Sequence, residues 1–294
     1  MSIPGTQEIQ IAGHIQCPTG CDVFCFHIQE LHTTTHLNDF INHLNEYIPE
    51  YVLSKHAIAT HEERINQGIT RKSVIEKARE FLQITKADRV YDSGEFGEFL
   101  LHLFATKVIG AHKLTSKMQA RGSRRHTIPG RDNVYAWQAE TGEIFMLIGE
   151  AKTKPSPNDC LREAQRDLNN FWATDKITHE IHLASTHIRE EMTVDNGRLY
   201  EAYFIDDNPA REQLGFKNII FIGYSNQAIS DLRAKAITID IFCQQLCSEI
   251  QRCLTNQQQI INESKHEALY CFLPFESIDD ARNIFAQTNN LIDH

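Results

Sequence analysis

The run Ile144-Phe145-Met146-Leu147-Ile148, followed by Gly149-Glu150-Ala151-Lys152, decides the fold that we expect for this chain of 294 residues. An uninterrupted apolar run of this length is typical of a strand that is buried on both faces of a sheet. Side chains alternate between the two faces of a strand, so Glu150 and Lys152 point the same way. The sequence therefore predicts a core strand that ends in an acid and a lysine on one face.

Further strand and helix patterns surround this run. The segment Asp132–Trp137 predicts a strand before it, and the turn residues Glu140–Glu143 join the two strands as a hairpin. Pro155 and Pro157 close the core strand before a helix. Other expected elements are helices at 37–44, 71–81 and 94–109, and strands at 113–118, 199–205, 218–223 and 268–273. Strands that are separated by helices indicate an α/β core.

The polar ends of the hairpin strands predict a metal site. If the two strands pair, Asp132 joins Glu150 and Lys152 at one end of the sheet. Carboxylates and carbonyls are the ligands that Mg²⁺ prefers, so Asp132, Glu150 and the carbonyl of Ala151 are the expected ligands. A bound ion of this kind lowers the pKa of a water molecule, and Lys152 can orient the resulting hydroxide or stabilise developing negative charge. This is the chemistry of metal-dependent phosphodiester cleavage.

Two neighbouring helices supply further candidates. On the amphipathic helix expected at 94–109, Glu98, or alternatively Glu95, can bind a second ion or a metal-bound water. On the helix after Pro157, Gln165 lies off the apolar stripe and can position the attacked phosphate. The stripe of that helix consists of Leu161, Ala164, Leu168, Phe171 and Trp172.

The charge of the chain is unevenly distributed. The net charge is −10, which is unusual for a protein that binds nucleic acid. However, no Asp or Glu occurs from Phe99 to Arg131, a stretch that also contains Lys107 and Lys113. The phosphate-binding candidates in this stretch are Lys117, Arg121, Arg124, Arg125 and Arg131. A basic segment that leads directly into Asp132 favours the binding of phosphate groups.

The eight cysteines do not have the pattern of a disulfide scaffold. The gaps between Cys17, Cys21 and Cys25 are wider than the pairs of most zinc sites, although a zinc-bound regulatory protein is one alternative. The N-terminus lacks the basic start and apolar core of a signal peptide, and no apolar run is long enough to span a bilayer. A cytoplasmic protein is therefore expected.

Asp132, Glu150 and Lys152 match the signature of PD-(D/E)xK nucleases. More closely, the motifs Gly94-Glu95-Phe96-Gly97-Glu98, Ser116-Lys117-Met118, Gly130-Arg131-Asp132 and Gly149-Glu150-Ala151-Lys152 resemble the HamA nucleases of Hachiman anti-phage defence systems. The resemblance is strongest from about Asp92 to Phe171, and the segment Cys271–Phe275 also resembles the end of that family.

This resemblance implies a restriction-endonuclease-like fold, in which a mixed central sheet is flanked by helices. It implies a nuclease domain at 86–294 and a helix-rich N-terminal region at 1–85 that is a candidate partner-binding region. It also implies a Mg²⁺-dependent deoxyribonuclease, in which Mn²⁺ can substitute, controlled by a superfamily 2 helicase that resembles HamB. Residue by residue, the resemblance supports Glu98, Asp132, Glu150 and Lys152, and leaves open whether Glu95 serves the site and whether Lys117 only contacts phosphate.

Two other functions fit the same residues. A restriction-type or repair-type nuclease of the same fold would recognise its own target, with the N-terminal region as a recognition element. A non-catalytic nucleic-acid-binding module could keep the fold, but such modules usually lose the acid or the lysine, and Asp132, Glu150 and Lys152 are all present.

Overall fold

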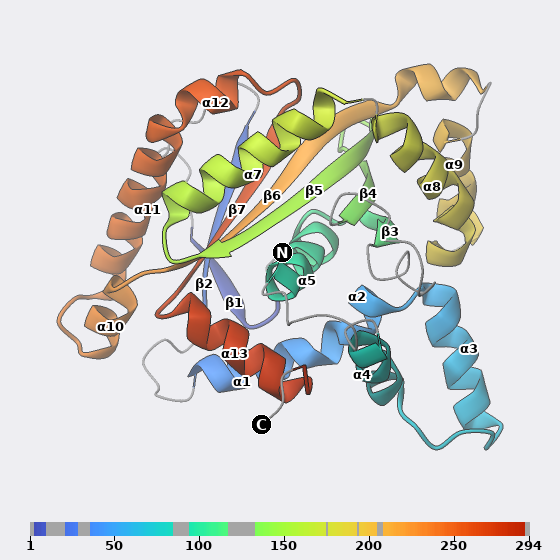
Figure 1. The fold of residues 1–294 in the computed structure, drawn as a ribbon, viewed down its shortest axis with the longest axis horizontal. Helices are drawn as coiled ribbons and strands as arrows, with labels where there is room; N and C mark the ends of the chain where they lie inside the picture. Colours follow the sequence, from blue (N-terminus) through green and yellow to red (C-terminus); the bar gives the residue numbers. More distant parts are fainter. Residues whose placement is uncertain are drawn as a thin grey trace.

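A mixed β-sheet forms the centre of the molecule (Figure 1). The computed structural model describes residues 3–9, 21–28, 36–84, 94–116, 133–174, 176–192, 194–204 and 208–291. Within these ranges the sheet has seven strands in the order β1-β2-β7-β6-β5-β4-β3. Their bounds are β1 Thr6–Ile9, β2 Asp22–Ile28, β3 His112–Ser116, β4 Asn133–Gln138, β5 Ile144–Lys154, β6 Gly215–Ser225 and β7 Ala268–Phe275.

The four central strands β2, β7, β6 and β5 run parallel, and antiparallel strands flank them on both edges. All eight residues of β7 are buried, as expected for a central strand that is covered on both faces. The predicted hairpin is confirmed, because β4 pairs antiparallel with β5 from Gln138 opposite Ile144 to Asn133 opposite Gly149. The core strand also extends further than its apolar run, through Glu150 and Lys152 to Lys154.

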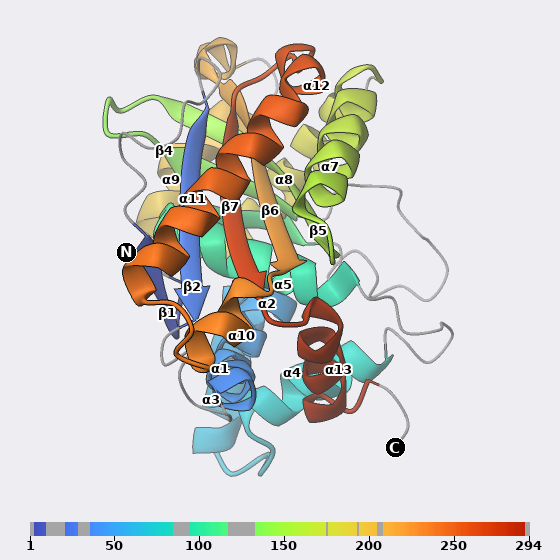
Figure 2. The same cartoon turned by 90° about the vertical axis from the view of Figure 1, so that its left-hand side faces the viewer.

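Helices cover both faces of this sheet. Their bounds are α1 His36–Leu44, η1 Asn45–Tyr47, α2 Ile48–Val52, α3 Lys55–Asn66, α4 Val74–Ile84, α5 Gly94–Leu103, η2 Phe104–Val108, α7 Pro157–Trp172, α8 Lys176–Glu191, α9 Val194–Phe204, η3 Pro209–Gln213, α10 Ala228–Arg233, α11 Ile239–Asn256, α12 Gln258–Asn262 and α13 Ile278–Thr288. In Figure 2, α7 and α11 lie in front of the sheet and α5 lies behind it. The predicted α/β fold, a mixed sheet flanked by helices, is confirmed.

Strand alternation decides which helix each side chain meets. On β2, Phe24 and Phe26 contact Phe104, which follows α5, whereas His27 contacts Phe242 on α11. The same alternation on β5 directs Gly149, Ala151 and Thr153 toward α5, and the residues between them toward α7.

Helix α7 begins where the sequence analysis expected it. The Ser156 side chain accepts a hydrogen bond from the backbone N–H of Asp159, and Pro157 occupies the first turn, where its missing N–H costs nothing. Its stripe of Leu161, Ala164, Leu168 and Phe171 is buried against the sheet.

The helix expected at 94–109 does not have one buried face and one exposed face. All residues of α5 from Glu95 to Leu103 are buried, because β5 lies on one side of the helix and aromatic residues of α2 and α13 lie on the other. The chain continues beyond Leu103 as a short π-helix, η2.

One expected element is wrong. The segment 199–205 was expected to be a strand, but residues up to Phe204 belong to helix α9, on which Tyr200 and Phe204 are buried one turn apart. A short apolar run does not distinguish a strand from a buried helix. The first 85 residues are rich in helices, as expected, and they also supply β1 and β2. These two strands extend the central sheet at β7, and residues such as Ile3 and Phe26 belong to the common core.

No helix in the ranges given above combines the length and the apolar character that crossing a membrane requires.

The absence of a side chain at Gly149 allows the hairpin and α5 to meet. A Cβ atom at this position would lie 2.8 Å from the Asn133 carbonyl oxygen and 2.9 Å from Leu101 Cδ2. We expect Gly149→Ala to lower the free energy of unfolding by roughly 1–3 kcal/mol, because backbone must move to admit the methyl group. Gly197→Ala on α9 is the matched control, because the nearest atom to its Cβ among the described residues would be Met192 Cβ at 3.9 Å. Equal urea midpoints for the two variants would contradict this explanation.

Candidate functional site

The polar end of β5 extends beyond the end of its neighbour. In the described residues β4 ends at Asn133, opposite Gly149, so Glu150 and Lys152 are the next positions along β5 whose side chains face α7. Asp132 directly precedes Asn133 in the chain and lies outside the described residues. The predicted grouping of Asp132 with Glu150 therefore stays a prediction, although the pairing of Asn133 with Gly149 is the register that it requires.

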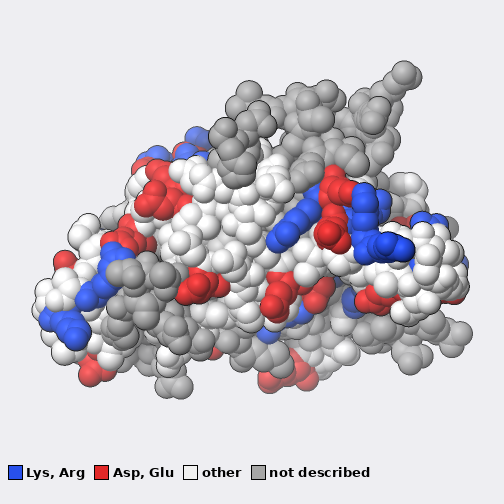
Figure 3. Space-filling model, turned by 90° about the horizontal axis from the view of Figure 1, so that it is seen from below, with Lys and Arg blue, Asp and Glu red and all other residues white. Residues whose placement is uncertain are grey.

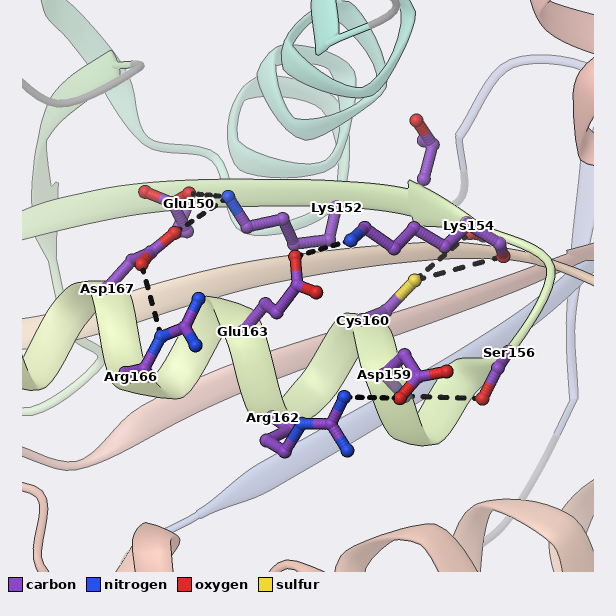
Figure 4. Close-up of polar contacts among 12 residues, drawn as sticks. Glu150, Lys152, Lys154, Ser156, Asp159, Cys160, Arg162, Glu163, Arg166 and Asp167 are labelled. Atoms are coloured by element: carbon purple, nitrogen blue, oxygen red, sulfur yellow. Dashed lines mark hydrogen bonds and ion pairs between the residues drawn. The ribbon is translucent and has the colours of Figure 1, made fainter.

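Lysines of β5 form ion pairs with acids of α7 (Figure 4). The Lys152 Nζ lies 2.7 Å from Glu150 Oε1 and 2.9 Å from Asp167 Oδ2, and the Lys154 Nζ lies 2.6 Å from Glu163 Oε2. Two residues along a strand span about 6.6 Å, and four residues along a helix span about 6 Å. The spacing of the two lysines on β5 therefore matches the spacing of the two acids on α7, which runs antiparallel to β5.

Burial differs between these two ion pairs. Side-chain exposure is 6% for Glu150 and 21% for Lys152, but 41% for Lys154. Burial alone lowers the pKa of the Lys152 ammonium, but the carboxylates of Glu150 and Asp167 outweigh this effect and raise it above its ordinary value. Lys152 is therefore a cation at neutral pH, suited to donate hydrogen bonds and to neutralise negative charge.

Glu95 and Glu98 both lie on the buried helix α5. Helix α5 packs on the face of β5 opposite to α7, since a Cβ at Gly97 would lie 3.4 Å from the Cβ of Ala151. The Tyr51 hydroxyl of α2 donates a hydrogen bond of 3.2 Å to Glu98 Oε2. The two glutamates thus belong to a helix on the other side of the sheet, and the choice between them stays open.

Gln165 is not brought to this group, although the sequence analysis placed it off the apolar stripe of α7. It is fully buried, and its Oε1 accepts a hydrogen bond of 3.0 Å from the Tyr270 hydroxyl of β7, while its Nε2 donates to Asn169 Oδ1. Strand β6 separates β7 from β5. In this arrangement Gln165 holds α7 to the sheet, and the polar α7 residue beside Lys152 is Asp167.

Asp167 was not among the predicted residues, although the sequence contains a signal for it. Glu163 and Asp167 are four residues apart on α7, and Lys152 and Lys154 are two residues apart on β5. A search for acids at helical spacing after a strand with lysines at alternate positions would have found this pair.

The five phosphate-binding candidates Lys117, Arg121, Arg124, Arg125 and Arg131 all lie outside the described residues. Two other cations of the same basic stretch are engaged internally. Lys107 Nζ lies 2.7 Å from Glu50 Oε2, and Lys113 is 6% exposed with its ammonium directed at backbone carbonyls of the α2 region. On the face shown in Figure 3, the Lys and Arg groups of the described residues lie beside Asp or Glu.

The described cysteines do not form a metal centre. No group of three His, Cys, Asp or Glu side chains within the described ranges is arranged to hold an ion. Cys17 lies outside those ranges, and burial raises the pKa of the Cys21 and Cys25 thiols, which disfavours the thiolate that zinc needs.

Replacing Lys152 by alanine removes a cation that lies 2.7 Å from the buried Glu150 carboxylate. We expect Lys152→Ala to lower the free energy of unfolding by roughly 1–3 kcal/mol, because a buried charge that loses its partner keeps its desolvation cost. Lys154→Ala, two residues along the same strand, removes a more exposed pair and should cost less than about 1 kcal/mol. Urea unfolding at pH 7 measures both values.

The raised pKa of Lys152 determines how the difference in unfolding free energy between the wild type and Lys152→Ala depends on pH. A lysine whose folded pKa is raised contributes stability that is complete below the unfolded pKa, about 10.4, and is lost as pH rises through the folded pKa. The difference between the wild type and Lys152→Ala should therefore be the same at pH 7 and pH 9. A difference that has largely disappeared by pH 9 would show that the ammonium is not held by the two carboxylates.

Comparison with known proteins supports the resemblance seen in the motifs. A search of curated proteins finds no match. The family model described as HamA matches residues 8–288, nearly the full length of the chain and therefore much more than the central motifs. The chain belongs to the HamA family of Hachiman defence-related proteins.

Proposed function

We propose that this protein is a metal-dependent DNA endonuclease, the effector of an anti-phage defence system, and that a partner helicase holds and controls it. The observation that carries the proposal is the ion pair of Glu150 with Lys152 at the end of β5, on the face toward α7. An acid and a lysine one residue apart, beside the strand that Asp132 precedes, are the groups that phosphodiester hydrolysis needs.

The donor set suits a hard divalent cation. Glu150 and Asp167 direct carboxylate oxygens at a single ammonium, so anionic oxygen is already concentrated at this point of the sheet. Glu150, Asp132 and the carbonyl of Ala151 would hold Mg²⁺, or Mn²⁺ in its place. Glu98 or Glu95 comes from the opposite face of the sheet and would reach the ion past the edge of β5, beyond the point where β4 ends in the described residues. When bound, the ion would supply Lewis acidity and a water of lowered pKa.

Lys152 serves the reaction as a cation in this proposal. Its ammonium donates to Glu150 in the structure and can donate instead to a phosphate oxygen on which negative charge develops during hydrolysis. Asp167 would keep the ammonium at this place when Glu150 holds the ion, so that Lys152 would retain one carboxylate partner.

The charge distribution supports control by a partner. The net charge is −10, and Lys107 and Lys113 of the one acid-free basic stretch are occupied within the protein. Affinity for duplex DNA depends largely on contacts between cations and phosphates, so the free protein should bind DNA weakly at physiological salt. A superfamily 2 helicase that resembles HamB would deliver the DNA, in the cytoplasm, to Lys117, Arg121, Arg124, Arg125 and Arg131.

Cleavage assays test the proposed site. Plasmid and linear DNA are incubated with Mg²⁺ or Mn²⁺ and with the wild type, Lys152→Ala or Lys154→Ala, each alone and with the helicase and ATP. We expect Lys152→Ala to lose at least about a hundredfold in rate, because it removes electrostatic stabilisation of the transition state. Lys154→Ala is the matched control, since it removes an ion pair with the same helix, and should cleave nearly as fast as the wild type.

Equal cleavage by Lys152→Ala and the wild type would refute the assignment of the site. No cleavage by folded wild-type protein under any condition would favour the non-catalytic nucleic-acid-binding module. Sequence-specific cleavage without the helicase would favour the restriction-type or repair-type nuclease.

Binding of a labelled 30-base-pair duplex tests the delivery step. At 150 mM salt we expect the isolated protein to bind with a dissociation constant weaker than about 1 µM, as is typical of non-specific contacts, and the complex with the helicase to bind more tightly. Fluorescence anisotropy measures both constants. Tight binding and rapid cutting by the isolated protein would remove the need for a delivering partner.

A further inference from the structure

Tyr51 belongs to the N-terminal region, on helix α2, and is buried beside α5 (Figure 2). Its ring packs against Phe99 and His102 of α5, with distances of 5.5 and 5.8 Å between ring centroids. Its hydroxyl donates the hydrogen bond of 3.2 Å to Glu98 Oε2. Because the ring is held by these contacts, the hydroxyl can hold the carboxylate in one orientation.

The backbone that carries Tyr51 is held by a second buried residue. The ammonium of Lys113 on β3 donates to the carbonyls of Glu50 and Leu53 at 2.8 and 2.9 Å, and to that of Tyr51 itself at 3.4 Å. Glu191 at the end of α8 lies 3.5 Å from the same ammonium. A lysine that bonds to the last carbonyls of a helix holds that end of the helix in place. Tyr51 is therefore fixed at its backbone as well as at its ring.

Glu98 lies where the described part of β4 ends. The side chain of Asn133 donates from Nδ2 to the Glu98 carbonyl at 3.5 Å. Asn133 directly follows Asp132 in the chain and pairs with Gly149, the residue before Glu150. Beyond this pair the edge of β5 has no neighbouring strand in the described residues, and a carboxylate of α5 would pass that edge toward the α7 face.

The packing of α5 on β5 distinguishes the two glutamates of this helix. A Cβ at Gly97 would lie 3.4 Å from Ala151 Cβ, and a Cβ at Gly149 would lie 2.9 Å from Leu101 Cδ2, so α5 runs antiparallel to β5. The glutamate level with this part of β5 is Glu98, because the other one is three residues earlier and lies about 4.5 Å farther toward the end of the strand.

We propose that Tyr51 is a positioning residue of the site described above, and that its hydroxyl orients the Glu98 carboxylate toward the ion that Glu150 would hold. This inference rests on the proposed function. A carboxylate can accept a hydrogen bond and bind an ion together, since its two oxygens offer about four lone-pair sites. Partners that hydrogen-bond a metal ligand fix its orientation. The N-terminal region thereby takes part in the site, in keeping with its place in the common core.

Mn²⁺ titration of the full chain, followed by electron paramagnetic resonance of the free ion, tests this role. Tyr51→Phe keeps the ring contacts and removes only the hydroxyl. We expect it to weaken Mn²⁺ binding, and to raise the Mn²⁺ concentration that gives half-maximal cleavage, at least about tenfold. Tyr270→Phe is the matched control, because it removes another buried hydroxyl that donates a hydrogen bond, on the second strand from β5. It should bind Mn²⁺ as the wild type does.

A double-mutant cycle separates positioning from a general effect on the structure. In the Glu98→Gln background, Tyr51→Phe should change the Mn²⁺ affinity less than about twofold, because the hydroxyl acts through that carboxylate. The inference is overturned if Tyr51→Phe binds Mn²⁺ as the wild type does, if it weakens binding equally in both backgrounds, or if Tyr270→Phe weakens binding as much.

Glu150→Gln distinguishes failure of this inference from failure of the proposed function. If Glu150→Gln loses the Mn²⁺ site and Tyr51→Phe keeps it at full affinity, the role of Tyr51 alone is wrong. If Glu150→Gln binds Mn²⁺ as the wild type does, the proposed site is wrong, and the role of Tyr51 is wrong with it.

Discussion

The ion pairs of Lys152 with Glu150 and Asp167 are the interaction on which the functional end of this molecule depends. A carboxylate that is buried to the extent of Glu150 needs a cation, and Lys152 on the same face of β5 provides it. Asp167 ties the same ammonium to α7, so the geometry of the acid and the lysine is fixed by two elements. A strand end exposed to water would instead leave both side chains free to rotate.

Glycines on β5 and α5 allow this strand end to be held from the opposite face. A Cβ at Gly97 would lie 3.0 Å from Thr153 Cγ2, and a Cβ at Gly149 would lie even closer to its neighbours. Helix α5 can therefore approach β5 closely enough to bring Glu95 and Glu98 toward the sheet. The glycines of the motifs Gly-Glu-Phe-Gly-Glu and Gly-Glu-Ala-Lys thus have a packing role, and the polar residues beside them carry the proposed chemistry.

How much the sequence could predict depended on the range of the interactions involved. The hairpin, β5, β6, β7 and α7 followed from local signals: an apolar run, turn residues and a capped amphipathic helix. The pairing of β2 with β7 joins residues about 250 positions apart, and no local pattern encodes it. Helix α9 was mistaken for a strand because Tyr200 and Phe204 pack in a short apolar run. Gln165, which was expected at the site, is instead buried against Tyr270, and Asp167, which was not predicted, meets Lys152. A helix on a wide sheet buries more than its apolar stripe, and only the register of α7 on β5 decides which polar residue meets Lys152.

The central claim, that the Glu150 carboxylate is a metal ligand held ready by Lys152, is tested most directly by Mn²⁺ binding to the full chain. Electron paramagnetic resonance of free Mn²⁺ in a titration gives the number and affinity of the sites without any need for cleavage. For Glu150→Gln the account predicts that a site present in the wild type is lost or weakened at least about tenfold, because a neutral amide replaces a charged oxygen ligand. Glu163→Gln, which changes the acid paired with Lys154 on α7, should bind Mn²⁺ as the wild type does. The same number of sites with the same affinity in Glu150→Gln and the wild type would contradict the account.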